Sequence, residues 1–80
     1  TTLFPNPNTG VFSLQINGDF DTQITIEVFN AIGQAVWRTE EGVLSQGGIV
    51  NVDISSVDPG LYFACVSGNG KQEVIRFTVH

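Results

Sequence analysis

The sequence predicts an all-β domain, an immunoglobulin-like antiparallel β-sandwich of six to seven strands. Three observations support this fold class. Hydrophobic residues alternate with a period of two, not with the period of 3.6 that is typical of a helix. Turn dipeptides that contain glycine separate the alternating segments at intervals of about 10 residues. The chain has 80 residues, which is enough for one hydrophobic core.

Three strands and one optional strand are predicted in the N-terminal half. Residues 2–4 add a seventh strand to the sandwich if they pair with a neighbour. Residues 11–16 and 24–28 have apolar side chains at every second position, so each strand has one buried and one solvated face. These positions are Phe12, Leu14, Ile16, Ile24, Ile26 and Val28. Residues 34–39, which include Val36 and Trp37, form the next predicted strand.

Three further strands are predicted in the C-terminal half. Residues 50–54 and 72–79 alternate again, which predicts two more half-buried strands. Their apolar positions are Val50, Val52, Ile54, Ile75, Phe77 and Val79. Residues 61–66 are apolar on both faces, as in a strand that lies in the middle of a sheet covered on both sides. We therefore expect this segment at the centre of the fold.

Turn residues separate these strands. The dipeptides at 17–18 and 69–70 are both Asn-Gly, which tolerates the positive φ of tight hairpin turns. Gly33 can take the left-handed position that closes a loop starting at Asn30. Residues 57–60, Val-Asp-Pro-Gly, have the chemistry of a type II turn. The chain is therefore expected to reverse direction at each of these places.

Tyr62 stands two residues after Gly60, at the start of the predicted central strand. This position is similar to the tyrosine corner of Greek-key sandwiches, in which the phenol donates a hydrogen bond to backbone a few residues upstream. We expect a mainly structural role for Tyr62, because its hydroxyl needs a partner when the ring is buried.

Charge and composition make several partners and sites unfavourable. Three basic and eight acidic residues give a net charge of −5, which repels nucleic acid and anionic membranes. No apolar run approaches the roughly 20 residues needed to span a bilayer, so direct membrane insertion is not expected. Cys65 is the only cysteine, which excludes an internal disulfide. Cys65 lies among apolar residues, where a thiol acts as a small hydrophobic side chain.

Catalytic and metal sites are not expected. The only histidine is His80, the last residue, so a catalytic base beside a nucleophile is missing. The aspartates at 19, 21, 53 and 58 offer few of the six to eight oxygens that calcium takes. Residues 67–71 lack the spacing and the following helix of a phosphate-binding loop, so they predict a hairpin turn. We therefore expect no cofactor, no metal and no enzymatic activity.

Two non-catalytic alternatives remain open from the residues alone. Trp37 and Phe20 are the aromatic residues expected to be partly exposed, and exposed aromatic rings on sandwiches can stack on sugars. This possibility corresponds to an adhesive or carbohydrate-binding accessory module. A passive spacer between other domains is a further possibility that the sequence does not separate from the first.

Four segments together resemble one known family. They are residues 4–14, which contain Pro5-Asn6-Pro7 and Gly10, residues 26–36 with Gly33, residues 52–62 with Gly60-Leu61-Tyr62, and residues 74–79. In order and spacing they are similar to the C-terminal sorting domains of type IX secretion, of type A, also called Por secretion signal domains. The resemblance extends over essentially residues 3–79.

The resemblance implies a single sorting domain at residues 1–80, excised from a larger exported protein. Such a domain is a noncatalytic signal that directs the linked cargo from the periplasm across the outer membrane, to the cell surface or the medium. A sortase-like protease typically removes it. The motif residues Pro5, Asn6, Pro7, Gly10, Gly33, Gly60 and Tyr62 then have mainly structural roles.

The closing hairpin is the segment that we expect the type IX translocon to recognise. The expected contact residues are Lys71, Glu73, Val74, Ile75, Arg76, Phe77 and Val79. This segment is apolar and β-prone, and it holds two of the three basic residues of an acidic chain. Recognition by edge pairing or in a groove is the expected mode, and a weak dimer through strand edges is possible for the same reason.

Overall fold

The computed structural model describes residues 1–16, 23–41, 48–68 and 70–80. The predicted turn at 17–18, Asp19, Phe20, Asp21 and Asn69 lie outside the described residues. The described chain forms seven β-strands and contains no helix. They are β1 (Thr2–Phe4), β2 (Val11–Gln15), β3 (Ile24–Asn30), β4 (Ala35–Glu41), β5 (Ile49–Asp53), β6 (Gly60–Gly68) and β7 (Lys71–Val79).

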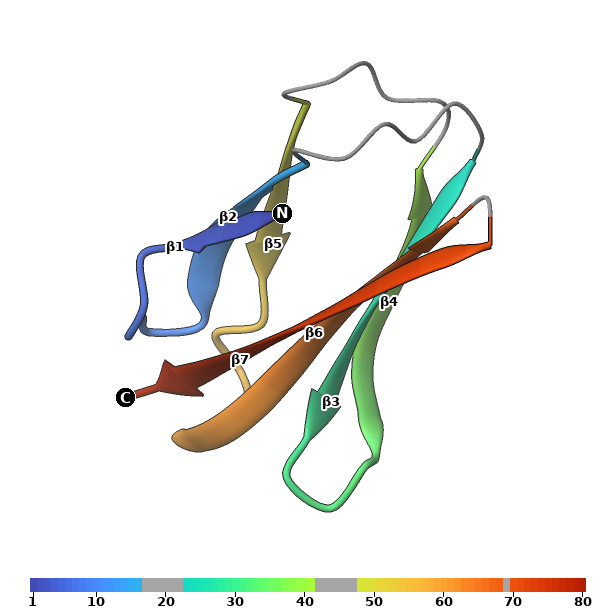
Figure 1. The fold of residues 1–80 in the computed structure, drawn as a ribbon. Coiled ribbons are helices and arrows are strands. Elements are labelled where there is room, and N and C mark those ends of the chain that lie inside the picture. Colours follow the sequence, from blue (N-terminus) through green and yellow to red (C-terminus); the bar gives the residue numbers. More distant parts are fainter. Residues whose placement is uncertain (17–22, 42–47, 69) are drawn as a thin grey trace.

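The strands form two antiparallel sheets. One sheet has the order β1-β2-β5 and the other has the order β4-β3-β6-β7. Figure 1 shows the two sheets as separate layers, with β7 at the edge of the larger one. This arrangement confirms the predicted all-β sandwich, and the pairing of β1 with β2 confirms the seventh strand.

The core lies between the two sheets and contains the alternating residues that the sequence indicated. The strand registers place these residues opposite one another, for example Val28 beside Ala64 and Ala64 beside Ile75. The buried core side chains are Leu3, Phe12, Leu14, Ile16, Ile24, Ile26, Val28, Val50, Val52, Ile54, Tyr62, Ala64, Val66, Phe77 and Val79. All strands except β4 therefore contribute buried residues at alternate positions, as expected for a period of two.

The central position of β6 is confirmed, but the expectation that it is covered on both sides is wrong. β6 pairs with β3 on one side and β7 on the other. Its inward residues are buried, whereas Leu61 is 38% exposed and Phe63 is half-buried on the opposite face. Only Cys65 is buried among these outward residues. A sandwich of two layers leaves the outer face of even its inner strands without a second covering sheet.

The turn predictions are confirmed at Gly33 and Gly70 and corrected at Gly60. Gly33 and Gly70 have φ of 87° and 73°, as their loops require. Gly60 also has a positive φ, but at 153° it is far from the roughly +80° of a type II turn. The corner before β6 therefore uses glycine without forming the regular turn. The tyrosine corner is confirmed, because the Tyr62 hydroxyl donates a hydrogen bond to the Asp58 carbonyl.

Candidate functional site

The closing strand β7 divides the predicted contact residues between the surface and the core. Lys71, Val74 and Arg76 are exposed, and Val74 is 60% exposed. Glu73 and Ile75 are half-buried. The other two side chains point into the core: Phe77 is 1% and Val79 is 3% exposed. The sequence therefore placed all seven on one strand, and the structure decides which of them a partner can touch.

Phe77 attaches the C-terminal half of β7 to the core. Its ring centroid lies 4.6 Å from that of Phe12 on the opposite sheet and 6.0 Å from that of Tyr62 on β6. Offset aromatic pairs at these distances are favourable beyond the area that they bury. Phe77 is therefore an anchor between the sheets, and its side chain is not available to a partner.

The backbone of β7 offers hydrogen-bonding groups on the side away from β6. The Thr78 N–H donates to Asn6 Oδ1 at 3.2 Å, and the Thr78 carbonyl accepts from the Asn8 N–H at 3.0 Å. Since these groups alternate in an antiparallel ladder, the backbone groups of Gln72, Val74 and Arg76 point the same way. Among the described strands, β6 alone pairs with β7. We call the outward backbone groups of residues 72, 74 and 76 the β7 edge.

Asn6 and Asn8 close the other end of this edge, and we call them the asparagine clamp. Asn8 is 2% exposed, and its side chain accepts from the Gly10 N–H at 2.8 Å and donates to the Pro5 carbonyl at 3.0 Å. Its carbonyl accepts from the His80 N–H at 2.8 Å. The motif residues Pro5, Asn6, Pro7 and Gly10 thus serve to fold a loop against the end of β7.

The sequence-based set of motif residues missed Asn8. The sequence does contain a signal for the role of Asn8, because asparagine in a proline- and glycine-rich loop commonly forms hydrogen bonds with nearby backbone groups. Its burial could not be read from the sequence, since it depends on the loop lying across the end of the opposite sheet. Asn8 and Val79 form an isolated parallel bridge there.

β7 carries one carboxylate that has a partner and two cations. The amino group of Thr1 lies 2.8 Å from the Glu73 carboxylate, and this hydrogen bond lowers the pKa of Glu73 from its ordinary value of 4.5. Lys71 and Arg76 take part in none of the ion pairs formed by the described residues. Within the described part of the chain, these two exposed cations on β7 therefore have no carboxylate partner.

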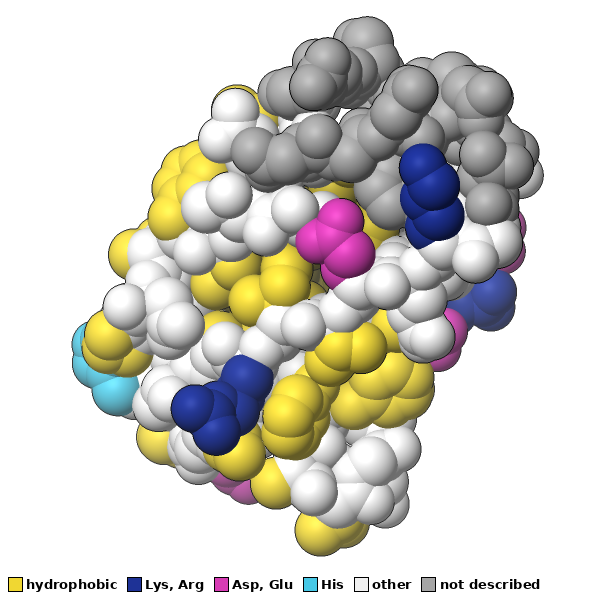
Figure 2. All heavy atoms as spheres, viewed as in Figure 1, with side chains coloured by type: hydrophobic (Ala, Val, Ile, Leu, Met, Phe, Trp, Pro, Cys, Tyr) yellow, Lys and Arg dark blue, Asp and Glu magenta, His cyan; other side chains and the backbone are white. Residues whose placement is uncertain are grey.

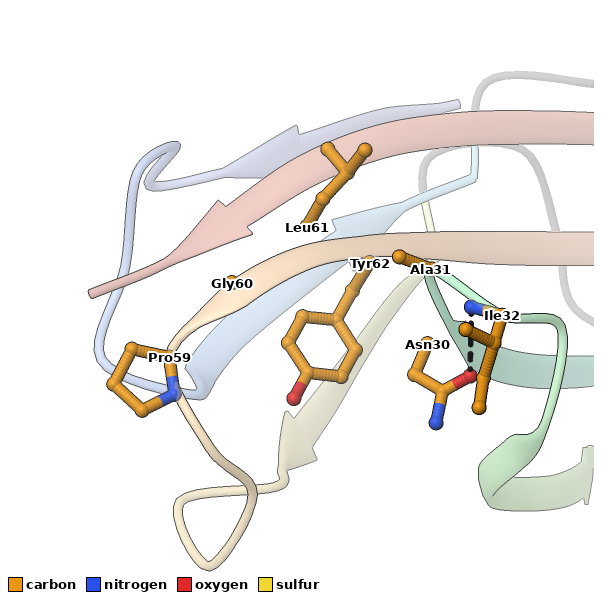
Figure 3. Close-up of a pocket in the computed structure, with 7 residues that line it drawn as sticks. All are labelled: Asn30, Ala31, Ile32, Pro59, Gly60, Leu61 and Tyr62. Carbon is orange, nitrogen blue, oxygen red and sulfur yellow. Dashed lines mark hydrogen bonds between the residues drawn. The ribbon is translucent and has the colours of Figure 1, made fainter.

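Two other motif residues, Gly60 and Tyr62, line a shallow hollow of about 250 Å³ at one end of the sandwich. Figure 3 shows Tyr62 and Asn30 side by side there, with Leu61 pointing away from the Tyr62 ring. The Asn30 side-chain oxygen accepts from the N–H groups of Ile32 and Gln34, so it is already satisfied. No charged residue lines the hollow. Gly60 and Tyr62 line this hollow, and their mainly structural role stays a prediction.

The remaining candidate residues form no reactive site in the described part of the chain. No group of three or more histidine, cysteine, aspartate or glutamate side chains lies within reach of one metal ion there. Cys65 is buried, and its sulfur accepts a hydrogen bond from Gln72 Nε2 at 3.0 Å. Trp37 is half-buried and packs against the core. In residues 1–16, 23–41, 48–68 and 70–80, no helix is long and apolar enough to cross a membrane.

Comparison with known families identifies the chain. The family model of the secretion system C-terminal sorting domain matches residues 2–80. A search of the curated proteins gave no match. The family match supports the resemblance of the four segments, and nothing supports the adhesive or carbohydrate-binding alternative. Members of this family act as noncatalytic signals for export across the outer membrane to the cell surface or the extracellular space. The chain therefore belongs to the family of secretion system C-terminal sorting domains, and it is a sorting signal of type IX secretion.

Proposed function

We propose that this domain forms the C-terminal end of a larger exported protein and that the type IX translocon reads it at the β7 edge. One observation carries the proposal: the backbone groups of Gln72, Val74 and Arg76 point away from β6, and no described strand pairs with them. An edge of this kind can accept an extended segment of another protein as an added strand. The domain itself provides no catalysis.

The arrangement of side chains around the edge fits this mode of recognition. Main-chain hydrogen bonds would supply affinity, and the exposed side chains of Lys71, Val74 and Arg76 would supply specificity. Phe77 and Val79 hold the strand in place from the core side. The asparagine clamp ends the available edge at Thr78, so an added strand would pair with about the first six residues of β7.

The same edge could join two copies of the domain. Antiparallel pairing of β7 with a second β7 would extend the four-stranded sheet across both molecules. Because each copy carries a net charge of −5, we propose that such a dimer is weak.

The route of the cargo follows from the role of a sorting signal. We propose that the linked protein passes through the periplasm before it crosses the outer membrane, and that a sortase-like protease then removes the domain. The cut would precede β1, because cleavage within the sandwich would separate strands that share one core.

The test is a fusion of these 80 residues to a periplasmic reporter in a host that has the type IX apparatus. Val74→Pro removes one outward N–H group without removing a bond to β6, so the domain should fold while strand addition is blocked. Val74→Thr keeps the N–H and the β-branched shape and is the matched control. We expect export of the Val74→Thr fusion and loss of export for Val74→Pro.

Two outcomes would contradict the proposal at different points. Normal export of a folded Val74→Pro fusion would exclude strand addition at the β7 edge. Retention of the unmodified fusion in a competent host would exclude the sorting function itself. Deletion of residues 72–80 should also stop export, but it removes Phe77 and Val79 from the core and so tests folding as well as recognition.

A further inference from the structure

The outer face of the four-stranded sheet brings together apolar side chains from three strands. Phe29 on β3 lies beside Phe63 on β6, and Phe63 lies beside Arg76 on β7. In the neighbouring rows Cys65 lies beside Val74, and Leu61 lies beside Thr78. Cross-strand neighbours on one face are close enough for their side chains to touch. We call Phe29, Leu61, Phe63 and Val74 the outer apolar patch.

No described element covers this patch. The β1-β2-β5 sheet packs on the opposite face of β3, β6 and β7, where Val28, Ala64 and Phe77 are buried. Val74 and Leu61 are exposed, and Phe29 and Phe63 are half-buried. Figure 2 shows hydrophobic side chains gathered beside β7, next to a basic side chain. Isolated exposed apolar residues are common, but a contiguous group of them is typical of an interaction surface.

Arg76 gives the patch a charge preference. It lies in the same cross-strand row as Phe29 and Phe63, and it makes no ion pair or side-chain hydrogen bond with the described residues. Glu27, the carboxylate on the outer face of β3, is in the next row, beside Cys65. A guanidinium among apolar side chains favours a carboxylate that is buried together with it, because charge-assisted bonds strengthen when water is excluded.

The patch is continuous with the β7 edge, since Val74 and Arg76 belong to both. A strand added to the edge would extend the sheet and bring the rest of the partner over its outer face. A second copy of this chain would instead bring a second Arg76 and another net charge of −5. The charges therefore favour a different protein over a copy of this chain.

We propose that the outer apolar patch is the docking surface for the type IX component that reads the signal, and that this component presents apolar side chains around a carboxylate that pairs with Arg76. This inference rests on the proposed function and adds the chemistry of the partner. Strand pairing at the edge is nearly independent of sequence, whereas the patch and Arg76 let the partner distinguish this strand from other exposed strands.

The experiment compares charge reversals in the same reporter fusion. Arg76→Glu keeps the backbone edge intact and places a carboxylate opposite the partner's own carboxylate. We expect export to fall by about tenfold or more, the factor that corresponds to about 1.4 kcal/mol. Arg38→Glu is the control, because it makes the same change of charge at an exposed site on β4, the edge strand opposite to β7 in the same sheet. Its export should match that of the unmodified fusion.

A second pair of variants tests the apolar part. Val74→Asp adds a charge within the patch, and Val11→Asp adds one at a similarly exposed valine on β2, in the other sheet. We expect reduced export only for Val74→Asp. Circular dichroism and thermal unfolding of the purified variants establish that each is folded.

The outcomes separate this inference from the proposal on which it rests. Normal export of Arg76→Glu and Val74→Asp, together with failure of Val74→Pro, would overturn the patch and leave the β7 edge as the recognised element. Equal loss of export for Arg38→Glu would also overturn it, because net charge alone would explain the effect. Sedimentation could show that the unmodified domain is a dimer and that Val74→Asp is a monomer. If export of Val74→Asp were also unchanged, the patch would bind a second copy of this chain, and the inference would be overturned. Failure of the unmodified fusion would overturn the proposed function and this inference together.

Discussion

At the scale of single residues, polar side chains in loops determine how the sandwich is closed. Asn8 binds the backbone on both sides of the loop that it occupies, and Tyr62 binds the backbone of the corner before β6. Gly10 is buried, so its bond to Asn8 satisfies an N–H group that would otherwise lack a partner. Asn8 and Tyr62 therefore bind the backbone of this chain, whereas the residues that we propose to contact a partner lie on β7.

Two glycine substitutions should separate close packing from backbone strain. A Cβ at position 10 would lie 2.8 Å from the Ser55 Cα, and φ is 99°, so Gly10→Ala should destabilise the domain by about 3 kcal/mol or more. At Gly33 φ is 87° but nothing lies within 4 Å, so Gly33→Ala should cost about 1 kcal/mol. Urea unfolding of both variants measures the difference. Equal losses would show that the approach of Gly10 to Ser55 contributes nothing.

At the scale of elements, β7 performs two tasks with its two sides. Its inward side chains, Phe77 and Val79, belong to the core that joins the sheets. Its outward side chains and its edge face solvent, apart from the end that the asparagine clamp holds. The alternation of a β-strand makes this division possible, because neighbouring residues point to opposite faces.

Truncation of an inward and of an outward side chain of β7 should therefore change the stability of the domain by different amounts. Phe77→Ala removes a ring that contacts Phe12 and Tyr62, so we expect a loss of about 3–5 kcal/mol in the free energy of unfolding. Val74→Ala removes an exposed side chain and should change stability by about 0.5 kcal/mol or less. Denaturant midpoints of the two variants test this expectation. A stable Phe77→Ala variant would show that β7 is held mainly by its backbone ladder.

At the scale of the whole molecule, the domain consists of two sheets with free edges and has an acidic net charge. Few surface features therefore distinguish one region from another for a binding partner. Of the strands that edge the two sheets, β7 carries two cations, Lys71 and Arg76, that form no ion pair with any residue placed by the structure, on a chain of net charge −5. The contact between Thr1 and Glu73 joins the start of the chain to this strand. The two ends of the chain lie apart, because the C-terminus is at the far end of β7 (Figure 1).

The contact between Thr1 and Glu73 should make the stability of the 80-residue chain depend on pH. The pKa of Glu73 is lowered by its hydrogen bond to the Thr1 amino group, so the carboxylate binds protons more weakly in the folded state. Its contribution is present above about pH 4.5 and is lost as the pH falls through the lower folded pKa. Thermal unfolding between pH 3 and 6 should show a weaker pH dependence for Glu73→Gln.

Two controls define the origin of this effect. Acetylation of the amino terminus should reduce the pH dependence as much as Glu73→Gln does, because either change removes one of the two charges. Added salt should weaken it as well, since the carboxylate is partly exposed. An unchanged pH profile in both variants would show that the contact contributes nothing to stability.

The sequence by itself determined the strands, the inner face of each strand with alternating hydrophobic residues, and the family. The alternation of Phe12 with Leu14, or of Phe77 with Val79, is a local property of the chain, so it needs no knowledge of which strands pair. The tyrosine corner was predictable for the same reason, since Tyr62 reaches the carbonyl of Asp58 only four residues upstream.

Only the tertiary structure decided which side of β7 a partner can reach. The burial of Phe77 and Val79 depends on the opposite sheet, and the closure of the strand end depends on Asn6 and Asn8, some 70 residues away along the chain. The apolar residues on both faces of β6 indicated two covered sides, yet the sandwich covers one and leaves Leu61 and Phe63 facing outward. An apolar strand face is favoured to be covered, because burial removes apolar surface from water. The sequence does not determine whether the second sheet of the same chain or another protein covers it.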